Sequence, residues 1–380
     1  MTKIKYFDHA ATTAVNEEVL KEMIPYFNIN YGNPSSIYTL GRHAKSAIDV
    51  ARQKTAHAIG ANSNEIYFTG GGSESDNLAI KGVAYANKKR GNHIITTNIE
   101  HPAVLNTCHA LRNDGFEITF LGVNRDGKIS ISELKEAIRP TTILLSIMFA
   151  NNEIGTIQPI KEIGEVAKRN NIYFHTDAVQ AIGNIEIDVN MLNIDLLSMS
   201  AHKFYGPKGV GALYVRRGVE FQKILDGGHQ EKDKRAGTEN LAGIVGMGKA
   251  IELAYKGFEE KNKRIEDLRN YFISELEKRI PKVKLNGHRR DRLPGNCNVS
   301  FEGVNGEALL LNLDAEGIYA STGSACSSGS SSPSHVLLAI GLPQELAKGS
   351  LRVALGDENT KEDVDFLLQI LEKDVKKLRR

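Results

Sequence analysis

The chain has little of what marks several common classes of protein. It has no tryptophan, and its three cysteines, Cys108, Cys297 and Cys326, form no C-x-x-C pair. Neither a disulfide framework nor a cysteine zinc site is therefore predicted, and a reducing cytoplasm is the natural location. No apolar run approaches the ~20 residues that span a bilayer, and the first nine residues lack an apolar signal core. We expect a soluble, unprocessed protein that does not enter a membrane.

The chain also lacks an excess of charge of either sign. Its 48 lysines and arginines nearly balance 46 aspartates and glutamates, for a formal charge of +2. Because this balance gives no global attraction to polyanions, direct nucleic-acid binding is not expected, and a small substrate fits better. A chain of 380 residues, 41% of them hydrophobic, can bury an extensive core and should be globular.

From about Glu65 to Val215, short β-branched runs alternate with helical stretches. The runs are EIYF, HIITT, EITFLGV, TILLSIM, IYFHTD and DLLSMS, and the helical stretches include LAIKGVAYANKK and IKEIGEVAKRN. This rhythm predicts an α/β fold with a mostly parallel, buried sheet. A long helical pattern from about Leu241 to Arg279, followed by mixed elements, predicts a second, smaller α+β domain. In such sheets ligands collect at the carboxyl ends of the strands.

Lys203 ends one of these runs, in the stretch SMSAHKFYGPKGVG. At a buried strand end its amine can be desolvated, so that its pKa falls, and it can form a Schiff base with an aldehyde cofactor. A surface lysine before a Gly-Pro turn is the alternative.

Asp177 ends the run IYFHTD. An acid at a strand's carboxyl end can pair with a protonated pyridine nitrogen and keep the ring an electron sink. Gln180, three residues on, could reach the phenolic oxygen of the same ring if the chain turns helical there. The alternative is that Asp177 only caps the next helix.

The stretch GGGSESDN, residues 70–77, joins a predicted strand to a predicted helix. Glycines let the backbone approach a phosphate, and free N–H groups and the helix dipole favour an anion there. Together with Ser200 and His202 this stretch would form a phosphate cup, although a plain strand-to-helix turn is the competing interpretation.

Three more positions carry chemistry near predicted strands. His101 follows HIITT, and its imidazole could stack on a flat ring and exchange protons. Asn152 lies in NNEIG, after TILLSIMFA. Arg352, in SLRV, places a guanidinium in an apolar strand, where it needs an anionic partner. That partner could be a substrate carboxylate or an internal salt bridge.

Cys326 lies in STGSACSSGSSSPS, among small polar residues. Such placement suits a thiol that delivers sulfur to a partner, provided that it is locally activated. Cys108 and Cys297 lie in apolar periodic segments and should be buried and inert.

These motifs together resemble the cysteine desulfurases of iron–sulfur assembly, within the fold type I, aminotransferase-like enzymes. The resemblance runs from about residue 4 to the C-terminal helix and rests on DHAATT, YGNPSS, GGGSESDN, EH, NNEIG, HTDAVQ, SAHKFYGPKG, RAGTEN, STGSACSSG and SLRVALG. It implies pyridoxal 5'-phosphate as cofactor, L-cysteine as substrate and L-alanine as product. It also implies a homodimer with active sites at the subunit interface, and a sulfur acceptor such as an iron–sulfur scaffold or a tRNA-thiolation enzyme. We expect a large domain at 16–258 and a small domain, carrying the cysteine loop, at 1–15 and 259–380.

The resemblance also implies roles for single residues. Lys203 resembles the cofactor-bearing lysine, and Cys326 the cysteine that becomes a persulfide. The other matching positions are Asp177 for the ring nitrogen, Gln180 for the phenolic oxygen, His101 for ring stacking and acid–base work, Asn152 and Arg352 for cofactor and carboxylate contacts, and Gly72, Ser73, Ser200, His202 and, across the dimer interface, Thr238 for the phosphate.

The chain departs from the family where Ser331 and Ser332 replace the more usual Leu-Glu, which bears on partner contacts rather than on the chemistry. Two alternatives stay open, because fold alone does not fix chemistry. One is a different enzyme, an aminotransferase or a selenocysteine lyase. The other is a catalytically silent scaffold of a sulfur pathway.

Overall fold

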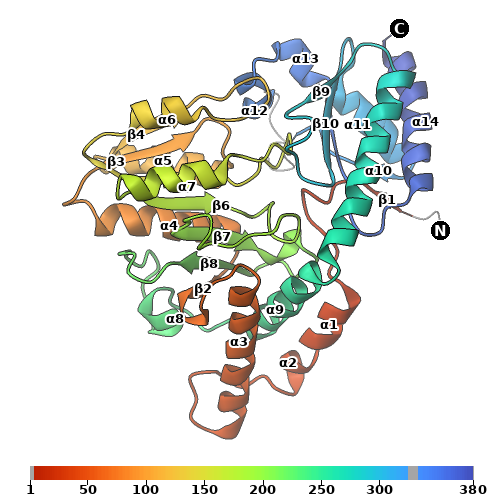
Figure 1. Ribbon diagram of the computed structural model, residues 1–380. Coiled ribbons are helices and arrows are strands. Elements are labelled where there is room, and N and C mark those ends of the chain that lie inside the picture. Colours follow the sequence, from red (N-terminus) through yellow and green to blue (C-terminus); the bar gives the residue numbers. More distant parts are fainter. Residues whose placement is uncertain (1–3, 324–332, 380) are drawn as a thin grey trace.

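The computed structural model describes residues 4–323 and 333–379. A seven-stranded sheet has the order β2-β8-β7-β6-β5-β3-β4 (Figure 1). Its strands are β2 (Ile66–Thr69), β3 (His93–Thr97), β4 (Glu117–Leu121), β5 (Thr142–Ser146), β6 (Tyr173–Asp177), β7 (Leu196–Ser200) and β8 (Gly211–Val215). All pairings are parallel except those of β8 with β7 and β2. The predicted mostly parallel α/β sheet is therefore confirmed, while β8 was not predicted.

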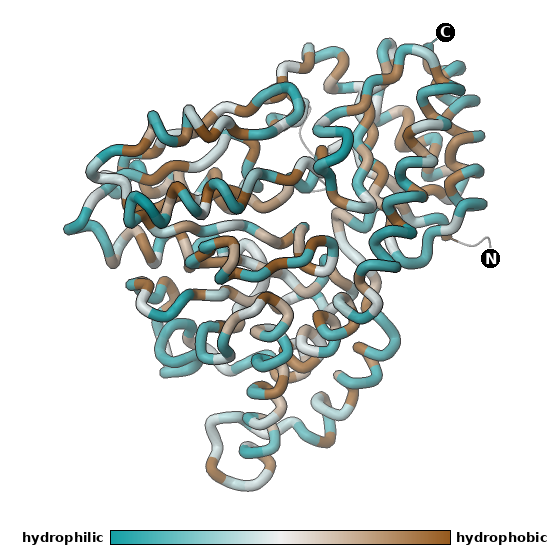
Figure 2. Tube along the Cα trace, in the orientation of Figure 1, coloured by the Kyte–Doolittle hydropathy of each residue, from teal (hydrophilic) through white to brown (hydrophobic). Residues whose placement is uncertain are grey.

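Both faces of this sheet are covered by helices. Since side chains alternate along a strand, Ile94 packs into one apolar core and Ile95 into the other. The core containing Ile94 lies under α4 (Gly72–Ala86) and α5 (Pro102–Asn113). The opposite core lies under α1 (Glu17–Met23), α3 (Thr39–His57), α6 (Ile131–Ala137), α7 (Ile160–Arg169) and α9 (Leu241–Tyr255). Hydrophobic and hydrophilic residues alternate along α7 in Figure 2, as expected of a helix with one buried face.

A third core is built from the C-terminal part of the chain. It packs around the antiparallel sheet β9 (Val283–Asn286), β10 (Asn296–Phe301) and β12 (Ser350–Ala354). Its helices are α10 (Phe258–Arg279), α11 (Gly306–Ala315) and α14 (Lys361–Leu378). Phe7 joins this core because β1 (Lys5–Tyr6) pairs with β11 (Ile318–Tyr319). The N-terminal segment thus belongs with the C-terminal core, as Figure 1 shows at the right.

The remaining helices are α2 (Pro25–Asn28), α8 (Gln230–Asp233), α12 (His335–Ala339) and α13 (Gln344–Lys348), with single 3₁₀ turns at Ser63–Glu65 and Ala201–Lys203.

The prediction of a single long helical pattern between Leu241 and Arg279 was wrong in one respect. The segment forms two helices, α9 and α10, because Lys256 is extended and Gly257 has a φ of +62°. Glycine adopts this left-handed conformation without the steric cost that other residues meet. As a result, α9 packs in the core beneath the large sheet and α10 packs in the C-terminal core.

The topology brings several strand ends to one edge. The parallel strands β3, β5, β6 and β7 end there, and β2 does too, since it is antiparallel to β8, which is antiparallel to β7. The residues that follow these strands are those predicted to carry the chemistry. Within the described residues, the model contains no helix that combines the length and apolarity needed to cross a bilayer.

Candidate active site

A cavity of about 210 Å³ opens at this edge of the sheet. Every predicted site residue lines it except Thr238 and Cys326. Thr238 is exposed and lies away from the cavity of its own chain, while Cys326 lies outside the described residues. The structure therefore gathers residues from five strand ends, the N-terminal segment and β12 around one space.

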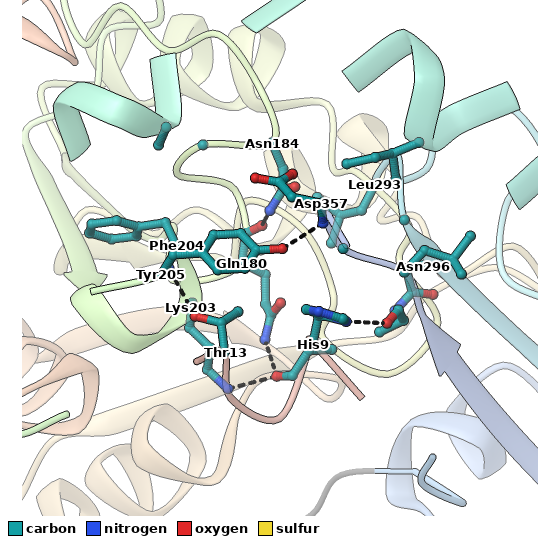
Figure 3. Close-up of a pocket in the computed structure, with 18 of the residues that line it drawn as sticks. His9, Thr13, Gln180, Asn184, Lys203, Phe204, Tyr205, Leu293, Asn296 and Asp357 are labelled. Atoms are coloured by element: carbon teal, nitrogen blue, oxygen red, sulfur yellow. Dashed lines mark hydrogen bonds between the residues drawn. The ribbon is translucent and has the colours of Figure 1, made fainter. Parts of the chain in front are cut away.

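Lys203 ends the 3₁₀ turn that follows β7. Its Nζ donates hydrogen bonds to the carbonyl oxygens of Ala10, at 2.6 Å, and Ala11, at 2.7 Å. Gln180 Nε2 donates to the same Ala10 oxygen at 2.9 Å, and both bonds are drawn in Figure 3, which looks into a neighbouring pocket that Lys203 also lines. The amine is thus held at the cavity rather than at the surface. Residues 10 and 11 were not predicted as site residues, although they lie in the DHAATT motif.

Asp177 is the last residue of β6 and is buried. Its Oδ1 accepts a hydrogen bond from the backbone N–H of Val179 at 2.9 Å, so it does cap the next turn, and it also lines the cavity. Burial raises the pKa of Asp177, whereas His101, the Val179 N–H and Lys203 act in the opposite direction. The turn that presents Gln180 closes through a hydrogen bond from the N–H of Ala181 to the Ala178 oxygen, at 2.8 Å.

His101 occupies the N-cap position of α5. Its Nδ1 accepts the N–H of Ala103 at 3.1 Å, so the proton of the neutral ring lies on Nε2. Burial lowers the pKa of His101, although the nearby charge of Asp177 opposes this. A neutral imidazole that carries its proton on Nε2 can donate a hydrogen bond from Nε2 into the cavity.

The start of α4 has the properties of a phosphate cradle. Its N-cap, Gly71, supplies no side-chain hydrogen bond, which leaves first-turn N–H groups able to bind an anion. A methyl group on Gly72 would lie 2.7 Å from Val179 Cγ2, so only glycine lets the helix start this close to the turn after β6. Ser200 is buried at the end of β7, and burial together with Lys203 lowers the pKa of His202 to about 4.

Pyridoxal 5'-phosphate fits this donor set. The glycine-walled N-terminus of α4 suits a dianionic phosphate, and the buried carboxyl group of Asp177 suits a protonated ring nitrogen. Lys203 supplies the amine that an aldehyde requires.

Arg352 is buried in β12 and makes the internal salt bridge that the sequence had left open. Its Nη2 donates to Asp8 Oδ1 at 2.7 Å, and its Nη1 donates to the carbonyl oxygen of Asn152 at 3.1 Å. Its Nε has no hydrogen-bond partner among the described residues. The guanidinium also lines the cavity, so the ion pair and an anion-binding role are compatible.

Cys108 and Cys297 are both fully buried, as predicted. Burial raises the pKa of the Cys108 thiol to about 12 and that of Cys297 to about 11. Neither thiol is therefore a thiolate near neutral pH, and both behave as small apolar side chains.

A further residue, Asp76, lines the cavity and was not predicted. It lies in the GGGSESDN stretch, which had been interpreted only through its glycines and its first serine. The sequence carries no clear signal for it, because the polar residues of this helical segment resemble a solvated face.

Comparisons with known proteins show the family of the chain. The family model "Aminotransferase class-V" matches residues 5–367. The cysteine desulfurase IscS of Clostridium botulinum is 59% identical over 381 residues, covering 100% of this chain and 96% of that protein. A solved NifS-like protein has a TM-score of 0.92 and 39% identity, with coverage of 98% and 99%. A solved structure of SspA in complex with cysteine has a TM-score of 0.81 and 40% identity, covering 93% and 99%.

The chain belongs to the class-V aminotransferases, which are pyridoxal-phosphate enzymes of fold type I. Within that family its function is that of a cysteine desulfurase. The aminotransferase and the silent scaffold that were left open from the sequence are thereby set aside.

Proposed function

We propose that this desulfurase removes sulfur from L-cysteine at the cavity described above and passes it to Cys326 as a persulfide, releasing L-alanine. The observation that carries the proposal is that Lys203 and Asp177, from the ends of β7 and β6, line one cavity with the N-terminus of α4. The SspA structure in complex with cysteine supports cysteine as the substrate.

Pyridoxal 5'-phosphate, when bound, withdraws electrons from the substrate carbon through its protonated ring. Asp177 would hold the ring nitrogen through its negative charge, and the Gln180 amide would bind the phenolic oxygen. Gly72, Ser73, Ser200 and His202 would hold the phosphate.

Proton transfer falls to two residues of the chain. The Lys203 amine, now held by the Ala10 and Ala11 oxygens, removes the proton from the substrate Cα. His101 would stack on the ring and would supply the proton on its Nε2 to the reacting groups. Arg352 and Asn152 hold the substrate carboxylate and orient it beside the amine.

Sulfur transfer needs a thiolate. The Sγ of Cys326 attacks the substrate sulfur, the sulfur–sulfur bond forms, and the substrate carbon–sulfur bond breaks. The electron pair stays with the carbon fragment, which takes up one proton at Cβ, regains one at Cα and leaves as L-alanine. Sulfur is then handed from Cys326 to an acceptor, an iron–sulfur scaffold or a tRNA-thiolation enzyme, in the cytoplasm.

The assembly we propose is a homodimer. Residues of α1–α3 and their connections form an exposed apolar surface, with side chains between 48% and 90% exposed: Leu20, Ile24, Phe27, Ile29, Ile37 and Tyr38. A second copy of the chain would cover this N-terminal apolar surface. Thr238, exposed and away from its own cavity, would complete the partner's phosphate site. The core beneath the large sheet supports a large domain at 16–258, and the C-terminal core supports a small domain at 1–15 and 259–380.

The test is turnover of isotopically labelled cysteine, followed by mass spectrometry of both products. The wild-type protein should form L-alanine and a labelled persulfide on Cys326. Lys203→Ala should form neither, while Lys208→Ala, an exposed lysine of the same segment, should match the wild type. Alanine formation by Lys203→Ala, or persulfide on Cys108 or Cys297 alone, would refute the proposal.

A further inference from the structure

Asp76 carries a buried carboxyl group that has no role in the reaction described above. It lies near the start of α4, is 1% exposed and lines the cavity. Its Oδ1 has no hydrogen-bond partner among the described residues. A carboxylate oxygen of Asp76, a carboxylate oxygen of Asp177 and a ring nitrogen of His101 all lie within 4.8 Å of one another. Burying an anion without a partner is costly, so this carboxyl group needs an explanation.

The groups of β6 and β7 that lie beside Asp76 carry no positive charge. His175 Nε2, from β6, lies 3.7 Å from Asp76 Oδ1. His175 is fully buried, with Nδ1 2.9 Å from Ser146 Oγ and Nε2 3.0 Å from Ser198 Oγ. Burial lowers the pKa of His175 to about 3, so the imidazole is neutral throughout the physiological range. The Ser198 hydroxyl of this network lowers the pKa of Asp76, but the neutral ring supplies no charge to balance a carboxylate.

Asp177 is better supplied with groups that favour the anion. It accepts the Val179 N–H, and it shares the cavity with His101 and Lys203. Two carboxyl groups this close in a buried site do not both ionise. The proton therefore resides on the one with less support, which is Asp76. Burial and the charge of Asp177 together raise the pKa of Asp76 well above its usual value, and ionisation of the buried Glu100 would raise it further.

We propose that Asp76 is a positioning residue that holds the one proton of the Asp76–Asp177 pair and thereby lets Asp177 remain an anion facing the cavity. The inference rests on the proposed function in so far as Asp177 serves the cofactor ring. The protonation state itself is a property of the cofactor-free protein.

The experiment compares Asp76→Asn with Asp76→Leu in the full-length protein. Asparagine keeps the shape, the neutrality and an N–H donor, whereas leucine keeps only the volume. Asp374→Asn is the matched control, because Asp374 is also buried with an unpaired oxygen but lies on α14, far along the chain in the C-terminal core.

Two readouts need no turnover. In infrared difference spectra of the cofactor-free protein at neutral pH, Asp76→Asn should lose a protonated-carboxyl band. In titrations with pyridoxal 5'-phosphate, Asp76→Leu should bind about tenfold more weakly than Asp76→Asn, since leucine puts an apolar side chain beside the buried Asp177 charge. Asp374→Asn should bind the cofactor as the wild type does.

Several outcomes would overturn the proposal. These are an unchanged protonated-carboxyl band in Asp76→Asn, equal cofactor affinity of Asp76→Asn and Asp76→Leu, and an Asp76→Asn protein that does not fold. Asp177→Asn separates this inference from the proposed function. Normal alanine formation by Asp177→Asn would remove the role of Asp177 in the reaction, while the infrared assignment of the proton to Asp76 would stand or fall on its own measurement.

Discussion

Arg352 and Asp8 lie 344 residues apart in the sequence and form a buried ion pair, with 2.7 Å between Nη2 and Oδ1. The pair joins the N-terminal segment to β12 at the wall of the cavity. Asp8 Oδ2 also accepts a hydrogen bond from Ser321 at 2.8 Å. Ser321 in turn pairs through its backbone with Arg352. One contact therefore connects both ends of the chain to the residue expected to hold the substrate carboxylate.

Asp8→Asn should lower the free energy of unfolding by about 3 kcal/mol, because removing one partner leaves the Arg352 charge buried and uncompensated. Urea denaturation of the cofactor-free protein measures this. Glu165→Gln, which breaks the exposed pair with Arg169, is the control and should cost at most ~0.5 kcal/mol. Equal losses in the two variants would show that the Asp8–Arg352 pair is no more important than a surface contact.

Glu100 should make stability fall as the pH rises. It is 1% exposed, and burial raises its pKa from 4.5 to about 8. The folded protein therefore keeps a proton that the unfolded chain has already lost, so the wild type loses stability between about pH 4.5 and pH 8. Glu100→Gln removes this loss and should gain stability relative to the wild type across that interval.

Denaturation of the cofactor-free proteins at several pH values within and beyond this interval tests the Glu100 prediction. The exposed Glu302, whose pKa is lowered by Lys282, gives the control Glu302→Gln, which should show no such gain. Parallel pH profiles for Glu100→Gln and the wild type would mean that Glu100 is ionised in the folded state.

The native protein should expose one reactive thiol. Burial and raised pKa values protect Cys108 and Cys297, so a thiol reagent at neutral pH should label Cys326 alone, and all three cysteines after denaturation. Cys326→Ser should abolish labelling of the folded protein and persulfide formation. Mass spectrometry of labelled peptides decides this, and rapid labelling of Cys108 or Cys297 would contradict it.

The sequence predicts best what depends on local periodicity. The strands HIITT and IYFHTD were placed within a residue of β3 and β6, and the rule that strand ends gather at one edge led to His101, Asp177 and Lys203. The site residues found only in the structure depend on contacts between distant segments. Ala10 reaches Lys203 because β1 pairs with β11, more than 300 residues along the chain, and nothing in the sequence of either strand specifies that pairing.

Two other misses have different physical causes. Gly257 lies within an otherwise helical pattern, and a single glycine there is compatible with a continuous helix, so the break between α9 and α10 is decided by tertiary packing. Asp76 lies in a helical segment whose polar residues resemble a solvated face. Its burial follows from the helix packing against β6 and β7, which is a property of the sheet order rather than of the segment.

Thr238 offers a test of the assembly, because a residue that acts across an interface can be complemented. Thr238→Val should weaken pyridoxal 5'-phosphate binding by about 10- to 100-fold, since one hydrogen bond to a charged phosphate is lost. Its segment is otherwise kept in place by Arg235, whose Nε donates to Glu74 Oε1 at 2.7 Å. The folded structure of the variant should therefore be intact.

Mixing Thr238→Val with Lys203→Ala chains then distinguishes the two arrangements. If Thr238 serves the partner's site, each mixed dimer contains one site with a native Lys203 and a native Thr238, and activity rises above that of either variant alone. If Thr238 serves its own chain, every Lys203-containing site also carries the valine, and mixing restores nothing. Turnover after unfolding and refolding the two chains together, with each variant refolded alone as the control, measures the difference. Restored activity supports a homodimer with shared sites, and its absence would place Thr238 in the cavity of its own chain or outside the site altogether.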